Sequence, residues 1–163
     1  MIKTVKPNHC DHFAKRGRVI RNFKVSICSF LVGILLSMGA LVAYAGVANS
    51  NYVSYGPVFG YTYKNQASIS TGGTSAAAYT WVQNYDYANV PAGYMGAKAR
   101  MYNSSNVLVA QSDYLYNSSS SYGFNQMTMR SASGTYYSKG LTQAWNGSAY
   151  NTYNTAQSPN QNQ

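Results

Sequence analysis

Side chains able to carry out catalysis are scarce in this chain beyond residue 45. From Gly46 onward there is no histidine, cysteine or glutamate, and the carboxylates are Asp86 and Asp113 alone. Proton transfer, nucleophilic relays and transition-metal sites are built largely from imidazole, thiolate and paired carboxylate groups. Glycoside hydrolysis would need the two aspartates to act as a pair, but they fall on different predicted strands without a supporting motif. We therefore expect a non-enzymatic protein with no metal and no cofactor.

A binding chemistry is available to Lys98 and Arg100. They alternate with small or apolar residues between Tyr94 and Tyr102, so the two cations should be solvent-facing neighbours of these two tyrosines. Cations beside tyrosine rings suit a phosphate or carboxylate that carries sugars. Lys98, Arg100, Tyr94 and Tyr102 are therefore our candidate ligand-binding residues, the alternative being a solvated edge whose cations discourage aggregation. The residues expected to enter the core from the same segment are Met95, Ala97, Ala99 and Met101.

Tyrosine is the dominant aromatic residue, with 17 in the chain against two tryptophans and five phenylalanines. A tyrosine ring offers a rigid apolar face and a hydroxyl, which suits sugars, peptides and protein interfaces. Because large aliphatic residues are few beyond the leader, we expect most tyrosines, together with Trp81 and Trp145, to be structural. An exposed aromatic row, if one forms, should draw on Tyr94, Tyr102, Tyr114, Tyr116, Tyr136 or Tyr137.

Residues 1–45 are predicted to be an export signal. Seven basic residues precede an uncharged apolar run from Val25 to Ala45, which ends in Ala43-Tyr44-Ala45. Small residues at those positions predict cleavage after Ala45, with Ala48 as the second choice. The alternative is an uncleaved anchor formed by residues 25–45 with the domain outside. Either way we expect an extracellular domain that meets the membrane only through this segment.

Removal of the leader changes the charge of the protein. The net charge of +9 falls to about +3, because five basic residues then face only Asp86 and Asp113. This density is too low for nucleic-acid binding and gives a weak attraction to anionic envelope surfaces. Cys10 and Cys28 both lie in the leader, so no disulfide is expected in the domain.

The elements that must position these residues are predicted to be strands. Residues 46–157 alternate apolar and polar residues between turn formers and lack helical periodicity, which is typical of an all-β, antiparallel β-sandwich. We expect one domain of about 7–9 strands, followed by a disordered polar tail over 158–163. The predicted strands are Val58–Tyr63, Tyr79–Tyr87, a hairpin of Tyr94–Tyr102 with Val107–Tyr116, Tyr122–Arg130, and a hairpin of Thr135–Trp145 with Ser148–Thr155 around Asn146-Gly147.

Four short motifs carry a family resemblance. They are Tyr55-Gly56, Ala77-Ala78-Tyr79-Thr80-Trp81-Val82-Gln83-Asn84, Ala92-Gly93-Tyr94-Met95-Gly96-Ala97-Lys98-Ala99 and Ser112-Asp113-Tyr114-Leu115-Tyr116-Asn117. In order and spacing they resemble the lactococcin 972 family of secreted bacteriocins over about 60 residues. The resemblance implies a small cysteine-free β-sandwich exported by a cleaved signal, and action on the cell-wall precursor lipid II.

The chain departs from that family in two ways. The histidines that mark the family near its second strand are absent, and the stretch from about Ser118 has no counterpart in the type member. Part of this stretch, Gly134 to Gly140 and Trp145 to Tyr153, resembles the ends of uncharacterised exported proteins of Gram-positive bacteria. The resemblance therefore supports the fold more strongly than the bactericidal activity.

Two functions remain on the sequence alone. The first is a secreted binding protein at the bacterial cell envelope, bacteriocin-like in its most specific form, whose partner is a glycan or a lipid-linked cell-wall precursor. The second is a structural, matrix or surface-assembly protein that self-associates without a small-molecule ligand. This alternative follows from the richness in Tyr, Asn, Gln, Ser and Gly, which can favour ordered stacking.

Overall fold

The computed structural model describes residues 46–163. The predicted leader and its cleavage after Ala45 lie outside the described residues. The all-β prediction is confirmed, because residues 46–163 form thirteen strands in antiparallel sheets. The same residues contain no helix, and hence none long and apolar enough to cross a membrane.

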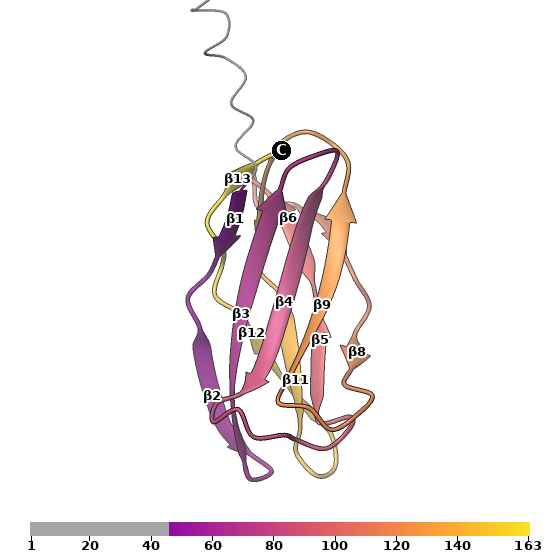
Figure 1. The fold of residues 1–163 in the computed structure, drawn as a ribbon. Coiled ribbons are helices and arrows are strands. Elements are labelled where there is room, and N and C mark those ends of the chain that lie inside the picture. Colours follow the sequence, from indigo (N-terminus) through magenta and orange to yellow (C-terminus); the bar gives the residue numbers. More distant parts are fainter. Residues whose placement is uncertain (1–45) are drawn as a thin grey trace, which may run out of the picture. The chain divides into compact units, whose positions relative to one another are not determined.

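One layer is a five-stranded sheet, drawn at the front of Figure 1. Its path is β1-β3-β4-β9, and β2 also pairs with β3. A tight turn at Phe59 and Gly60, with φ of 47° and 85°, joins β2 to β3. The predicted strand Val58–Tyr63 is wrong for this reason, because the chain reverses in its middle. The strands are β1 (Gly46–Asn49), β2 (Val53–Val58), β3 (Tyr61–Thr71), β4 (Ala76–Asn84) and β9 (Gly123–Arg130).

The opposite layer holds two four-stranded sheets, ordered β12-β11-β5-β8 and β13-β10-β6-β7. Their strands lie behind the first sheet in Figure 1, and apolar side chains fill the space between the layers. The strands are β5 (Met95–Lys98), β6 (Arg100–Asn103), β7 (Leu108–Gln111), β8 (Leu115–Tyr116), β10 (Thr135–Ser138), β11 (Leu141–Trp145), β12 (Tyr150–Asn154) and β13 (Gln161–Asn162).

The predicted hairpin after Tyr94 is present, but it bends between the two rear sheets. At the bend, Ala99 donates its N–H to Ser112 Oγ at 3.0 Å, and Ser112 donates its N–H to the Ala99 carbonyl at 2.9 Å. One half of the hairpin is β5 with β8, and the other is β6 with β7. Corners of this kind let strands change sheets. The bend divides two of the predicted strands into four, which is one reason why the strands outnumber the 7–9 that we predicted.

The last hairpin is confirmed around Asn146 and Gly147. Strands β11 and β12 pair from Leu141↔Asn154 to Trp145↔Tyr150, and Gly147 has a φ of 101°. The predicted strand Thr135–Trp145 is nevertheless interrupted at Gly140. Gly140 packs so closely on Thr80 that an added Cβ would lie 2.7 Å from the Thr80 Cβ. The close approach of the two layers therefore divides this strand into β10 and β11.

Strand β4 directs Trp81 away from the core. Thr80 and Val82 are fully buried between the layers, whereas Trp81 points outward with 36% of its surface exposed. Small inward residues are needed here because Gly140 of the opposite layer lies against Thr80. The predicted range Tyr79–Tyr87 is also displaced, since β4 ends at Asn84 and Tyr85 lies in the following turn.

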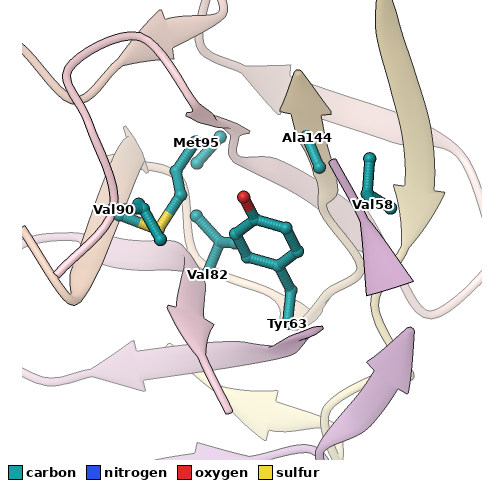
Figure 2. Close-up of a cluster of buried hydrophobic side chains, with 7 residues drawn as sticks. Val58, Tyr63, Val82, Val90, Met95 and Ala144 are labelled. Atoms are coloured by element: carbon teal, nitrogen blue, oxygen red, sulfur yellow. The ribbon is translucent and has the colours of Figure 1, made fainter. Parts of the chain in front are cut away.

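The core consists of two clusters. The face predicted to enter the core is confirmed, because Met95, Ala97, Ala99 and Met101 are all fully buried. Figure 2 shows the first cluster, with Tyr63 at its centre. This cluster contains Val58, Tyr63, Val82, Val90, Met95, Ala97 and Ala144, and the second contains Ala48, Ile69, Ala76, Ala78, Met101 and Tyr136.

The C-terminal tail is ordered, so the prediction of disorder over 158–163 is wrong. Ser158 is 1% exposed and its Oγ accepts the N–H of Ser138 at 2.9 Å. Strand β13 pairs with β10, and Gln163 Oε1 accepts the N–H of Gly72 at 3.0 Å. Side chains of the tail accept backbone N–H groups of the domain, as the backbone of a longer strand would do. These hydrogen bonds explain why a segment without large apolar residues still packs against the domain.

Candidate functional site

Lys98 and Arg100 stand on either side of the bend at Ala99. Lys98 ends β5 and Arg100 begins β6, and both side chains are partly exposed on the outer side of the rear layer. The Lys98 Nζ lies 5.6 Å from the ring centroid of Tyr114, and the Arg100 guanidinium carbon lies 5.6 Å from that of Tyr102. Each cation therefore sits within cation–π range of a tyrosine ring.

Arg100 is held in place by two hydrogen bonds. Its Nε donates to the Lys139 carbonyl at 3.1 Å, and one terminal nitrogen donates to Asn154 Oδ1 at 3.2 Å. The other terminal nitrogen, Nη1, has no hydrogen-bond partner within residues 46–163. A planar guanidinium fixed in this way is preorganised for a further acceptor such as a phosphate oxygen.

The structure brings Tyr102 to the cations but places Tyr94 elsewhere. Tyr102 stacks on Tyr137 with centroids 5.2 Å apart and an interplanar angle of 9°. Tyr94 packs on the first core cluster, 5.8 Å from Phe59 and 5.9 Å from Tyr61 between ring centroids. The prediction that Tyr94 neighbours Lys98 is wrong because β5 begins only at Met95, so strand alternation does not extend to Tyr94.

A row of rings crosses the sheet beside the two cations. Tyr114 and Tyr116 have centroids 6.5 Å apart, Tyr116 and Tyr150 are 4.6 Å apart, and Tyr150 and Trp145 are 5.2 Å apart. The Tyr116 ring lies over Gly96, where an added Cβ would come 2.7 Å from the ring carbon Cε1. The missing side chain at Gly96 thus lets the ring lie flat on the sheet.

Hydrogen bonds orient the polar ends of this row. Tyr116 donates its hydroxyl to Gln143 Oε1 at 2.6 Å, Gln143 Nε2 donates to Thr152 Oγ1 at 3.0 Å, and Tyr150 donates to the Gly93 carbonyl at 2.8 Å. We call this surface the Lys98 face. Its members are Lys98, Arg100, Tyr102, Tyr114, Tyr116, Gln143, Trp145 and Tyr150.

The electrostatics of the Lys98 face favour an anion. Within residues 46–163, neither Lys98 nor Arg100 forms an ion pair with a carboxylate. Burial raises the pKa values of Tyr114 and Tyr150, so both phenols remain neutral at physiological pH. The face therefore presents two positive charges and neutral rings, without an internal counter-ion.

The two aspartates lie in different exposed loops of the structure. Asp86 is exposed in the turn after β4, where its N–H donates to Asn84 Oδ1 at 3.0 Å. Asp113 is exposed between β7 and β8. Among the residues that the structure describes, no cluster of three or more His, Cys, Asp or Glu side chains could hold a metal ion.

Part of this face was predicted from the sequence. Tyr114 and Tyr116 lie in an exposed row as expected, whereas Tyr136 and Tyr137 are buried. The contributions of Gln143, Trp145 and Tyr150 were missed, because they arrive from the last hairpin through long-range pairing. The signal that could have revealed the ring stack is Gly96, since glycine inside a strand indicates close approach of another group.

Comparisons with known proteins provide no relative from which to infer a function. No family model matches the chain, and neither the curated proteins nor the solved structures contain a significant match. The resemblance to the lactococcin 972 family therefore stays a prediction.

Proposed function

We propose that this protein is a secreted, non-enzymatic binding protein of the bacterial cell envelope, and that the Lys98 face binds an anionic, sugar-bearing component of that envelope. One observation carries the proposal. Two cations without carboxylate partners adjoin a continuous row of aromatic rings. The cations would pair with phosphate or carboxylate oxygens, and the rings would stack on sugars.

A lipid-linked cell-wall precursor is the target that fits both chemistries. Its pyrophosphate would lie at Lys98 and Arg100, and its sugars along Tyr114 and Tyr116. The resemblance to secreted bacteriocins favours the same target. In its most specific form, the proposal is that the protein inhibits the growth of related bacteria.

The binding test uses the purified secreted protein, isolated cell walls, and vesicles with and without a lipid-linked precursor. Lys98→Gln and Arg100→Gln each remove one charged hydrogen-bond donor, worth about 1.5–3 kcal/mol, so we expect binding to weaken roughly 10- to 100-fold. Lys64→Gln is the matched control, because it removes the same charge from β3 in the opposite layer. Binding that survives both Lys98→Gln and Arg100→Gln unchanged would remove this face from consideration.

Surface assembly is a second candidate because of strand β9. This strand is eight residues long at an edge of the first sheet, with Met127 and Met129 exposed by 41% and 54%. Exposed edges are templates for pairing with another chain. Gln126 Oε1 accepts the N–H of Met127 at 3.1 Å, which blocks one edge donor. Thioflavin-positive fibres formed without envelope material would favour this candidate over the first.

A further inference from the structure

A groove of about 480 Å³ lies on the outer face of the first sheet, in the layer opposite the Lys98 face. Side chains of β1, β3 and β4 line it, together with Tyr52 from the segment before β2. Its volume falls within the range of about 300–1,000 Å³ that is usual for ligand sites. The groove is therefore large enough for a ligand and is separate from the face described above.

The floor of the groove is aromatic and exposed. Tyr79 and Trp81 are two residues apart on β4, so their side chains emerge on the same face. Trp81 is 36% exposed and Tyr52 is 51% exposed. Large rings open to water are the usual platforms for flat apolar ligand surfaces, including the faces of sugar rings.

Amides and hydroxyls stand beside these rings through the strand register. Gln66 is paired with Trp81, and Ser68 lies between Asn49 on β1 and Tyr79 on β4. The lining contains no Asp, Glu, Lys or Arg side chain. An uncharged lining offers nothing specific to an ionic ligand, whereas alternating rings and hydrogen-bonding groups suit a neutral polyhydroxylated one.

Two glutamines give the groove its hydrogen-bonding capacity. Gln66 Nε2 donates to the Ser50 carbonyl at 2.8 Å, which fixes this amide and leaves its Oε1 as an acceptor. Gln83 Oε1 is covered by neighbouring atoms and has no hydrogen-bond partner within residues 46–163. A buried acceptor without a partner is unfavourable, so a rotation of the Gln83 side chain that brings this oxygen to a ligand hydroxyl would stabilise both groups.

Lys64 contacts the ring of Tyr52, a lining residue, but does not itself line the groove. Its Nζ lies 3.9 Å from the ring centroid of Tyr87, and 5.4 Å and 5.5 Å from those of Tyr52 and Tyr85. Three rings therefore face the ammonium group, and this contact holds Tyr52 at the rim of the groove.

We propose that this groove binds a short stretch of uncharged polysaccharide. Sugar rings stack on Trp81 and Tyr79, and their hydroxyls hydrogen-bond with Gln66 and Gln83. A second copy of the chain is a poorer occupant, because a symmetric pair would place two hollows against each other and leave a void between them. The proposal does not depend on binding at the Lys98 face.

The test is affinity electrophoresis of the purified protein in native gels that contain a polysaccharide. The neutral probes are hydroxyethyl cellulose, soluble starch, galactomannan and laminarin, and polygalacturonate is the acidic probe. We expect retardation by at least one neutral polymer and none that is specific to the acidic polymer. Trp81→Ala should weaken this binding roughly tenfold or more, because stacked aromatic anchors commonly dominate affinity.

Two control variants separate the possible outcomes. Val107→Ala and Leu108→Ala each shorten an exposed apolar side chain that belongs neither to the groove nor to the Lys98 face; both should be retarded like the original protein. Circular dichroism checks that Trp81→Ala is folded, and Gln83→Ala gives a second variant within the groove. Absence of retardation in all neutral gels, retardation that persists in Trp81→Ala, or a dimer that Trp81→Ala disrupts would each overturn the proposal.

Discussion

Replacing Tyr63 with phenylalanine should stabilise this protein. The Tyr63 side chain is fully buried in the first core cluster, and its hydroxyl has no hydrogen-bond partner within residues 46–163 (Figure 2). The substitution keeps the ring and its packing and removes only the oxygen. Because an unsatisfied buried polar group costs about 1–3 kcal/mol, we expect the free energy of unfolding to rise by about that amount.

Tyr55 provides a matched control of opposite sign. Its ring stacks against that of Tyr63 with centroids 5.6 Å apart, and its hydroxyl shares a 3.1 Å hydrogen bond with Thr142 Oγ1. Tyr55→Phe is the same chemical change, but it breaks this bond. We expect it to lower the free energy of unfolding by about 0.5–1.5 kcal/mol. Both substitutions remove a hydroxyl, but only the Tyr63 hydroxyl lacks a hydrogen-bond partner. Opposite changes in the free energy of unfolding would therefore show the effect of that missing partner.

Alkaline pH tests the same hydroxyl in another way. Burial raises the pKa of Tyr63 from 10.0 to about 12. Above pH 10 the unfolded chain loses a proton that the folded chain keeps, so the stability contributed by Tyr63 is full below pH 10 and is lost as the pH rises to about 12. The slope from this one residue is about 1.4 kcal/mol per pH unit. Tyr63→Phe should flatten the decline over this window.

The assay is urea unfolding, followed by circular dichroism, at pH 7 and at steps from pH 9.5 to 12. The original protein, Tyr63→Phe and Tyr55→Phe are compared at each pH. A Tyr63→Phe protein that is less stable at pH 7 would refute the reasoning, because it would show that the hydroxyl is hydrogen-bonded, for example to a buried water.

Two further predictions concern packing at the surface. Gly96→Ala would place a Cβ 2.7 Å from Tyr116 Cε1 and should push that ring off the sheet, so binding at the Lys98 face should weaken several-fold while circular dichroism stays unchanged. Deleting residues 158–163 removes β13 and should lower the thermal midpoint of unfolding by several degrees. This shift corresponds to a loss of about 1–2 kcal/mol in a domain of this size. An unchanged midpoint would show that the tail contributes no stability.

Local chemistry accounts for what the sequence predicted correctly. Strand alternation is a property of neighbouring residues, so it identified Met95 and Met101 as members of one face, and that face is buried. The Asn146-Gly147 pair predicted the last turn because glycine accepts the positive φ found there. The all-β class followed from the same short-range patterns repeated along the chain.

Alternation alone does not say which face of a strand is buried, and for this reason it left the orientation of Trp81 open. That side chain points outward because Gly140, about 60 residues later, packs against Thr80 on the inner face of the same strand. No local pattern on β4 encodes this approach. The outward tryptophan, and with it the groove, exists because the two layers are close at this point.

By itself the sequence determined the strand class, the inward face of residues 95–101 and the scarcity of acid–base groups beyond residue 45. Only the tertiary structure decided that Tyr114 rather than Tyr94 meets Lys98, because Tyr114 arrives on the far arm of a bent hairpin. The same holds for the docked tail, which is ordered by hydrogen bonds to distant strands. Residues that share one face of a strand can be read from alternation along the chain. The residues that meet at a site are brought together by pairing between strands that are far apart in the sequence.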